Sequence, residues 1–183
     1  MTDIREYERL ARESGAFRDI ELDILVESIQ IWAEHPDDPN SLLELRDGPT
    51  LAGFAVMCRA PNTEFTFDVL ALCIGRSHAG GGVGPRLVEL IERHALAASG
   101  SAIVRFESSS RKERAMGPGL LASLDYSMIG HIPDFYERGD DYFMFAKHLF
   151  LESPEQTAAR TGATSPEGGP EPPRGDSVTR REQ

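Results

Sequence analysis

The sequence predicts a mixed α/β fold on three observations. Apolar residues recur at helical spacing over the first part of the chain, two apolar runs then flank an Asp-Gly pair, and short apolar runs alternate with helical segments in the second half. These patterns are typical of amphipathic helices, of a β-hairpin and of strands joined by helices, respectively. The predicted order is two helices, three strands, a helix, a strand, a weaker helix and two strands.

Two helices and a hairpin open the chain. Apolar residues lie three or four apart in "IREYERLARESG" and "DIELDILVESIQIWAEH", and Pro36 and Pro39 end the second helix. The run "SLLELRDGPTLAGFAVMCRA" is predicted as two strands joined at Asp47-Gly48, a dipeptide that favours hairpin turns. The run "TFDVLALCI", residues 66–74, has few polar positions and is predicted as a central strand.

Helices and strands alternate in the second half. A helix is predicted from about Gly82 to Ala98, then the strand "SAIVRFES", a weaker helix over about 111–124, the strand "YSMIGHI", a loop over 133–141 and the strand "YFMFAKHL". Pro118 lies inside the weaker helix. Because proline interrupts a helix in mid-run, we expect this helix to be short or kinked.

Composition limits the classes of partner and the compartment. The 183 residues carry a formal net charge of −11, which argues against a nucleic-acid partner and is compatible with a cationic small molecule such as an amine. No apolar run approaches the about 20 residues of a membrane span, and the charged start "MTDIREYERL" shows no signal peptide, so a cytoplasmic location is expected. The five histidines show no paired ligand spacing, so no metal is expected.

A change of composition at residue 153 marks the end of the predicted domain. Residues 153–183 contain five prolines, four glycines and no aromatic residue. Such a segment buries too little apolar surface to offset the entropy of ordering. We therefore expect one folded domain over residues 1–152 and a disordered tail over 153–183.

The stretch "RSHAGGGVGPRLVELIERHALAA" indicates an anion-binding turn. Glycine permits positive φ and close approach of the backbone, and the following helix offers unpaired N–H groups at its start. A Walker loop is excluded because no lysine and hydroxyl follow the glycines. A dinucleotide turn is excluded because its third glycine would fall on Pro85 or Leu87.

The segment Ala79-Gly80-Gly81-Gly82-Val83-Gly84 resembles the [QR]-x-x-G-x-[GA] turn of the GNAT acetyltransferase superfamily, with Ala79 in place of Gln or Arg. The closing segment "IPDFYERGDDYFMFAKHL" and the strand "NTEFTFDVLALCI" are similar to those of a bacterial subgroup with a "DFY…GDD" ending. The resemblance spans about Asp3 to Leu149. It implies a central, mixed, mostly antiparallel twisted sheet with helices on both faces and splayed central strands.

The resemblance also implies an activity, the acetyl-CoA-dependent transfer of an acetyl group directly to the primary amine of a small molecule. The pantetheine arm would pair with main-chain groups of the central strand, a nearby N–H would polarise the thioester carbonyl, and the glycine turn would hold the pyrophosphate. Arg76 and Arg86 would meet phosphates or remain solvated. The residues implied to contact acetyl-CoA are Leu72, Cys73, Ile74, Arg76, Gly80, Gly81, Gly82, Val83, Gly84 and Arg86.

Two groups of acids are candidates for the chemistry on the amine. Glu64 and Asp68 are expected to project to one face of the central strand, as base or as ammonium anchor. The alternative roles are a solvated Glu64 and a hydrogen-bonded structural Asp68. In the predicted loop over 133–141, substrate contacts are expected from Asp134, Asp140 and Asp141 and an acid role from Tyr136, unless the segment is simply a turn.

Several departures from the family pattern favour a second reading, a degenerate member that binds acyl-CoA or a protein partner without catalysis. Leu121 stands where the family's proton-donating tyrosine is expected, which leaves Tyr126, Tyr136 and Tyr142 as substitutes. The chain also starts at the first predicted helix, without the strand that usually precedes it. Either the true start lies upstream of this sequence, or the sheet has an unpaired edge through which a homodimer could form.

Overall fold

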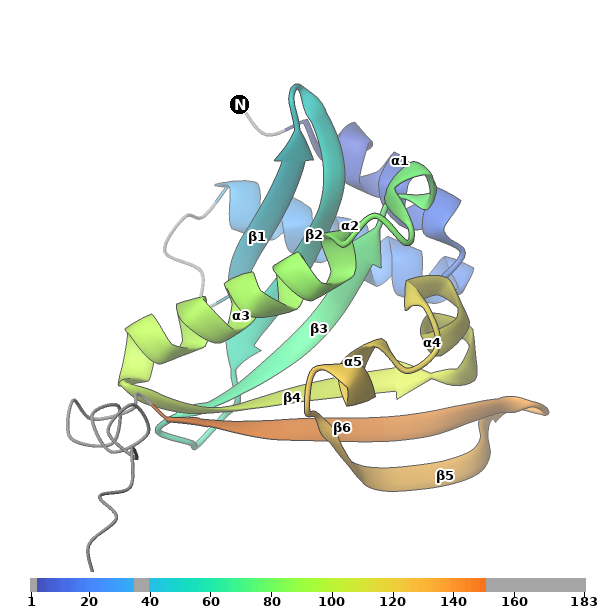
Figure 1. Ribbon diagram of the computed structural model, residues 1–183. Helices are drawn as coiled ribbons and strands as arrows, with labels where there is room; N and C mark the ends of the chain where they lie inside the picture. The colour runs from blue at the N-terminus through green and yellow to red at the C-terminus, as the bar shows by residue number, and fades with distance from the viewer. Residues whose placement is uncertain (1–2, 35–39, 151–183) are drawn as a thin grey trace, which may run out of the picture. The chain divides into compact units, whose positions relative to one another are not determined.

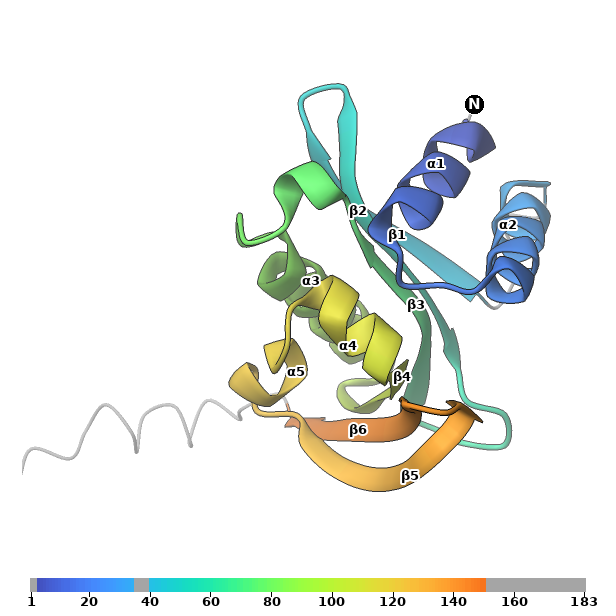
Figure 2. The same ribbon diagram turned by 90° about the vertical axis from the view of Figure 1, so that its right-hand side faces the viewer.

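Six strands form one sheet in the order β1-β2-β3-β4-β6-β5, and helices cover both of its faces (Figures 1 and 2). The computed structural model describes residues 3–34 and 40–150, so the predicted tail and the prolines expected to end the second helix lie outside the described residues. The elements are α1 Ile4–Ser14, α2 Asp19–Glu34, β1 Asn40–Asp47, β2 Thr50–Arg59, β3 Thr66–Ile74, the 3-10 helix η1 Arg76–His78, α3 Val83–Ser99, β4 Ser101–Ser109, α4 Ser110–Met116, α5 Leu120–Ser123, β5 Ser127–Glu137 and β6 Asp140–Phe150.

The sheet confirms the predicted fold class. Every neighbouring pair is antiparallel except β3 and β4, which are parallel. Helices α1 and α2 lie on one face, and α3 lies on the other with α4 and α5 (Figure 2). The parallel step arises because α3 carries the chain from the end of β3 back to the start of β4.

Two segments of the second half differ from the expectation. The weaker helix is two short helices, α4 and α5, separated by Gly117-Pro118-Gly119, because proline has no N–H to continue the ladder. The predicted loop over 133–141 is mostly strand, since β5 runs to Glu137 and β6 starts at Asp140. The turn between them takes a positive φ at Gly139.

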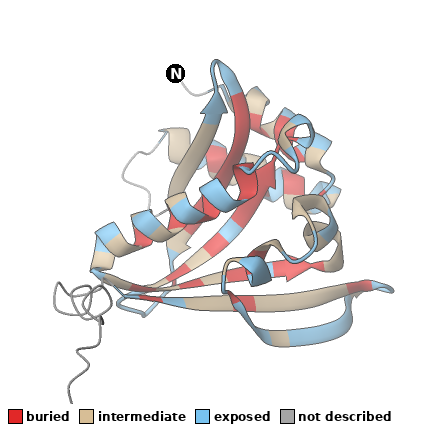
Figure 3. Ribbon diagram, viewed as in Figure 1, coloured by how far each residue is buried: buried red, intermediate tan, exposed pale blue. Residues whose placement is uncertain are grey.

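The core has two layers separated by the sheet (Figure 3). Strand β2 is buried on both faces, which explains its nearly continuous apolar run. On the α1/α2 side Tyr7 meets Phe54 edge to face at 5.2 Å, and on the α3 side Phe106 meets Tyr126 at 5.1 Å. The first pair joins α1 to β2, and the second joins the connection between α5 and β5 to β4.

The two outer strands differ in exposure. In the described part of the chain β1 pairs only with β2, and β5 pairs only with β6. The outer side of β1 is therefore an edge of the kind the sequence predicts, whereas β5 is exposed along most of its length (Figure 3). A homodimer through such an edge stays a prediction.

Replacing Phe54 by alanine should lower the free energy of unfolding by about 3–5 kcal/mol, because the side chain is fully buried between α1 and the sheet. Phe65→Ala is the matched control, since Phe65 is 41% exposed, and it should cost about 0.5 kcal/mol or less. Urea denaturation measures both. Equal losses would contradict the assignment of Phe54 to the core.

Candidate active site

The central strands separate at a β-bulge on β3. β3 pairs with β4 only from Thr66↔Ile103 to Val69↔Phe106. On its other side the register with β2 shifts from Met57↔Val69 to Val56↔Ala71, which leaves Leu70 as an extra residue. A bulge bends its strand, and β3 and β4 diverge from this point (Figure 1). The predicted splay is therefore present, and Leu70 marks its closed end.

Strand alternation decides which backbone groups of β3 face the open splay. The N–H of Gly75 donates to the carbonyl of Ala52 on β2 at 2.9 Å. Because alternate residues of a strand bond to opposite neighbours, Cys73 also bonds toward β2, and Leu72 and Ile74 present their N–H and C=O groups to the splay. Cys73 therefore cannot supply the main-chain groups expected of it, whereas Leu72 and Ile74 can.

The glycine turn lies at the open end of β3. Gly80 and Gly82 have φ values of +76° and +80°, which L side chains rarely adopt. Gly82 caps α3 without any side-chain hydrogen bond, so the N–H groups of Val83 and Gly84 have no side-chain partner there. Pro85 has no N–H, and the N–H of Arg86 donates to the carbonyl of Gly82 at 3.3 Å. A Cβ on Gly84 would lie 3.0 Å from side-chain atoms of Ile74 and Leu120. The turn thus combines left-handed glycines, a helix start and close packing.

Three cavities follow one another from this turn through the splay. The first, of about 360 Å³, lies between the glycine turn and the segment from Met116 to Leu120. The second is a narrow cavity of about 10 Å³ between β3 and β4, and it shares Met116 with the first. The third, of about 230 Å³, lies between α2 and β3. It shares four lining residues with the second: Phe17, Leu70, Ala71 and Lys112.

The two acids predicted on β3 do not reach the splay. Glu64 lies in the exposed turn before the strand, which begins at Thr66, so the prediction that it lies on the strand is wrong. Asp68 lies on the strand, but both carboxylate oxygens accept hydrogen bonds from Arg105 of β4, at 2.7 and 2.8 Å. Asp68 is thus the hydrogen-bonded acid of the alternative reading. Glu64 therefore lies away from the bulge, and the Asp68 carboxylate is held by Arg105.

A different acid, Glu107 of β4, lines the splay. It follows Arg105 by two residues and shares its face of the strand. Burial, followed by the nearby Glu107 carboxylate, raises the pKa of both Tyr136 and Tyr142. Both phenols therefore keep their protons at neutral pH. The Arg18 guanidinium lies over the Tyr136 ring, 4.3 Å from its centroid. This cation–π contact helps to hold the ring near Glu107.

The acids of the β5–β6 hairpin form hydrogen bonds within the hairpin and to the start of α4. The N–H of Gly139 donates to Asp134 at 2.6 Å, and the N–H of Asp134 donates to Asp141 at 3.0 Å. Asp141 also bonds His131 at 2.8 Å. Buried Asp140 accepts from the N–H of Arg111 at 3.0 Å, at the start of α4. These contacts do not support substrate contacts by the three aspartates. They hold the hairpin that presents Tyr136.

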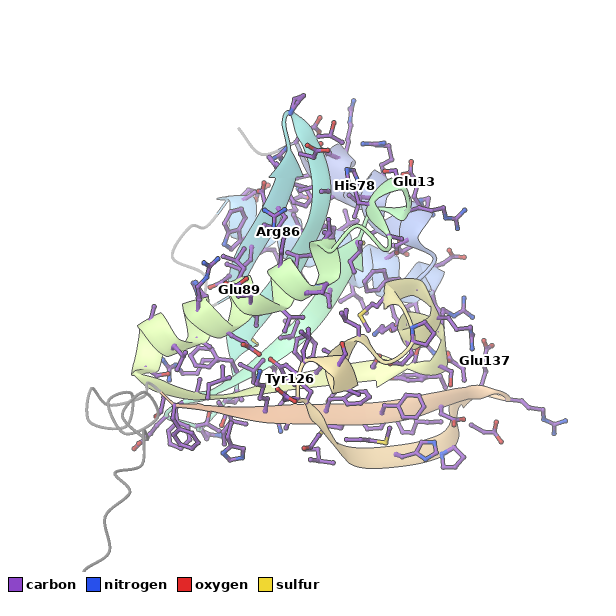
Figure 4. The ribbon with its side chains drawn as sticks, in the orientation of Figure 1. Glu13, His78, Arg86, Glu89, Tyr126 and Glu137 are labelled. Atoms are coloured by element: carbon purple, nitrogen blue, oxygen red, sulfur yellow. The ribbon has the colours of Figure 1, made fainter. Side chains whose placement is uncertain are left out.

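The position of the expected proton donor is closed to substrate. Leu121 is fully buried in the α3-side core. Tyr126 is buried as well, and burial followed by nearby Glu92 raises its pKa (Figure 4). Lys112 instead lines both the splay and the third cavity. Its Nζ lies 3.0 Å from Glu21 and 5.7 Å from the centre of the Phe17 ring.

The two arginines beside the glycine turn lie on different sides of it. Arg86 is exposed on the first turn of α3 (Figure 4). Arg76, on η1, lines an open groove with Arg9, Arg12 and Glu13 of α1. Arg76 therefore lies with other arginines outside the three cavities. Arg86 lies on the first turn of α3, next to the glycine turn.

Sequence reasoning missed Glu107, Lys112, Glu21 and Arg18. Glu107 carried one usable signal, since Arg105 and Glu107 alternate with Val104 and Phe106 in "IVRFES" and so define a polar face. Lys112 and Arg18 carried no signal in the sequence, because their positions depend on α4 and the α1–α2 connection packing near one another.

In the part of the chain that the structure describes, no three His, Cys, Asp or Glu side chains gather as a metal site would require.

The sequence model of the acetyltransferase (GNAT) family matches residues 4–116, from α1 through the bulged strand and the glycine turn to the end of α4. The chain belongs to this family. The GNAT match ends before β5, so the resemblance of the "DFY…GDD" segment to a bacterial subgroup stays a prediction.

Among the helices within residues 3–34 and 40–150, none has the length and apolar character that a membrane span requires.

Solved structures share the GNAT fold at low sequence identity. A GNAT-family protein from Desulfovibrio desulfuricans is 20% identical with a TM-score of 0.70, over 79% of this chain and 91% of that chain. The ribosomal-protein-S18-alanine N-acetyltransferase from Escherichia coli is 15% identical (TM-score 0.64; 84% and 92% covered). A Salmonella typhimurium protein with its cofactor acetyl-CoA is 14% identical (0.59; 82% and 88%). No curated protein matches the chain.

The ion pairs of Glu21 make a testable contribution to stability. Burial alone would raise the pKa of Glu21, but hydrogen bonds from Arg18 and the charge of Lys112 lower it from 4.5 to about 2. Since the folded pKa is the lower one, the stabilisation is complete above about pH 4.5 and is lost as the pH falls towards about 2.

Glu21→Gln should therefore lower the urea midpoint clearly at about pH 7 and much less at about pH 3. Glu27→Gln, exposed on the same helix, controls for the general effect of removing a carboxylate. A gap between wild type and Glu21→Gln that is the same at both pH values would contradict this role.

Proposed function

We propose that the protein is an acetyl-CoA-dependent N-acetyltransferase that moves an acetyl group directly to the primary amine of a small molecule. The observation that carries the proposal is the set of three neighbouring cavities with shared lining residues, which lie from the N-terminus of α3, past the splay at Leu70, to the far face of the sheet. The first cavity lies at backbone donors suited to an anion, and the third has room for a second substrate. Between them the open backbone groups of Leu72 and Ile74 would guide the chain that joins the two.

The residues present fit coenzyme A. The uncapped start of α3 and the left-handed glycines Gly80 and Gly82 offer backbone donors to the pyrophosphate, with Gly81, Val83 and Gly84 completing the turn. Arg86 lies nearest to add charge. The free backbone groups of Ile74 and Leu72 would pair with the pantetheine arm as a neighbouring strand would. Leu72 lies closest to the bulge, so its N–H is assigned to the thioester carbonyl.

Glu107 is the base in this proposal, in place of Glu64 or Asp68. An amine attacks only when neutral, so a carboxylate must take its proton directly or through one water. Glu107 lines the splay. Arg105, two residues before it on β4, is already paired with Asp68. Glu107 would take the first proton from the ammonium and pass it to solvent. As the C–N bond forms and the C–S bond breaks, Glu107 would take the second amine proton, and the thiolate would leave. Tyr136 and Tyr142, which stay protonated, lie near Glu107, and Tyr142 hydrogen-bonds to it.

The departing sulfur needs a positive charge or a proton, and Lys112 is assigned to it. Its ammonium lines the splay, where a thiolate would be released. Removal of water from a narrow cavity strengthens this attraction. The buried Leu121 accounts for the missing tyrosine, because that position packs in the α3-side core instead of facing the splay.

The second candidate, a protein that binds acyl-CoA without catalysis, is favoured by Leu121 and by Ala79 at the start of the turn. The two candidates differ in turnover. Thiol release from acetyl-CoA with a member of an amine panel supports the enzyme, and CoA binding without release by any amine supports the alternative. Failure to bind CoA at millimolar concentration would overturn both.

Gly82→Glu should abolish CoA binding, because it places bulk and negative charge at the start of α3. Gly100→Glu is a matched control: it introduces the same side chain at a similar φ of +75°, at the other end of the same helix, and nothing lies within 4 Å of either Cβ. Titration calorimetry with CoA measures both. Equal affinities in the two variants would show that the pyrophosphate does not bind at this turn.

Glu107→Gln should lower kcat by about 100-fold or more with little change in CoA affinity, the usual scale of a general base. Glu89→Gln, an exposed acid on α3 away from the cavities, should keep wild-type rates (Figure 4). A near-normal kcat in Glu107→Gln would remove Glu107 from the mechanism.

A further inference from the structure

The cavity between α2 and β3 has a mainly apolar lining. Phe17 and one face of α2 form one wall, Val56, Leu70 and Ala71 of the sheet form the other, and Lys112 closes one side. Its volume of about 230 Å³ equals roughly eight water molecules at about 30 Å³ each. This is room for a branched aliphatic or a phenyl-sized group.

Two large apolar side chains of this lining remain exposed. Ile24 on α2 is 59% exposed, and Leu70 on the bulge is 51% exposed. Exposed apolar side chains are ordinary when scattered, but these two line the same concave site. A ligand with an apolar body would remove both from water.

The polar groups of the lining are already occupied. The Glu21 carboxylate accepts from the N–H and Nε of Arg18, at 2.9 and 3.0 Å, and pairs with Lys112 at 3.0 Å. The Ser28 hydroxyl donates to the carbonyl of Ile24 at 2.8 Å. A second ammonium group in this cavity would displace one of these partners or stay unpaired, and either outcome is unfavourable.

We propose that the acceptor is an amine with a single cationic head and an apolar body, and that the body fills this cavity. This inference rests on the proposed function. Leu70 lines both the cavity and the splay, so a body held against Ile24 and Leu70 places its amine at the thioester and near Glu107. The lining discriminates against polycations such as aminoglycosides, because it offers no free carboxylate for their further amines.

The test compares Ile24→Asp with Ile20→Asp in the full chain. Both residues are exposed on α2, Ile20 at 68%, but only Ile24 lines the cavity. With 2-phenylethylamine or 3-methylbutylamine as acceptor, Ile24→Asp should raise KM by about tenfold or more, the effect of losing about two methylene contacts. Ile20→Asp should leave KM unchanged, and CoA affinity should be unchanged in both.

A second readout does not depend on turnover. In methyl NMR of the isoleucine-labelled protein, adding 2-phenylethylamine in the presence of CoA should shift the Ile24 methyl signals and leave those of Ile20 in place. An unmoved Ile24 signal would overturn the inference, as would faster acetylation of kanamycin than of either apolar amine. Absence of CoA binding would instead overturn the proposed function, so the two failures are distinguishable.

Discussion

Parallel strands can share hydrogen bonds only while their backbones run side by side, and here β3 and β4 do so over four residue pairs. The extra residue at Leu70 ends that pairing. Beyond it the backbone groups of Leu72 and Ile74 have lost one neighbour strand, although buried backbone groups need partners. An extended ligand supplies such partners, and the glycine turn lies where that ligand would leave the sheet.

The surrounding elements hold this opening in place and bring charged and polar side chains to it. Helix α4 follows β4 without a connecting residue, so Lys112 comes to lie at the mouth of the splay. Asp140 ties the start of α4 to β6, and the other hairpin aspartates shape the turn that carries Tyr136 towards Arg18. The ion pairs of Glu21 join α2 to α4 across the third cavity. Helix α4, the β5–β6 hairpin and α2 therefore support the same site through packing and ion pairs.

Most predictions that rest on local signals are present in the structure, although the loop predicted over 133–141 is mostly strand. The order of helices and strands, the interruption at Pro118 and the glycine turn all follow from neighbouring residues, and the structure contains them. Roles that depend on distant residues were not accessible. Asp68 looks like an unpartnered acid until Arg105, 37 residues later, pairs with it. The acidic hairpin resembles a cation site in the sequence, but its aspartates accept hydrogen bonds from nearby backbone N–H groups. Glu107 becomes a candidate base only because the fold places it beside the bulge.

Exchange of backbone amide protons tests the central claim most directly, because it reports on the splay itself. Adding CoA should slow the exchange of the Leu72 and Ile74 N–H groups, which face the opening, and leave that of Cys73, which bonds to β2, unchanged. Equal exchange at Leu72 and Ile74 with and without saturating CoA would contradict the account, because no ligand backbone would then pair with β3.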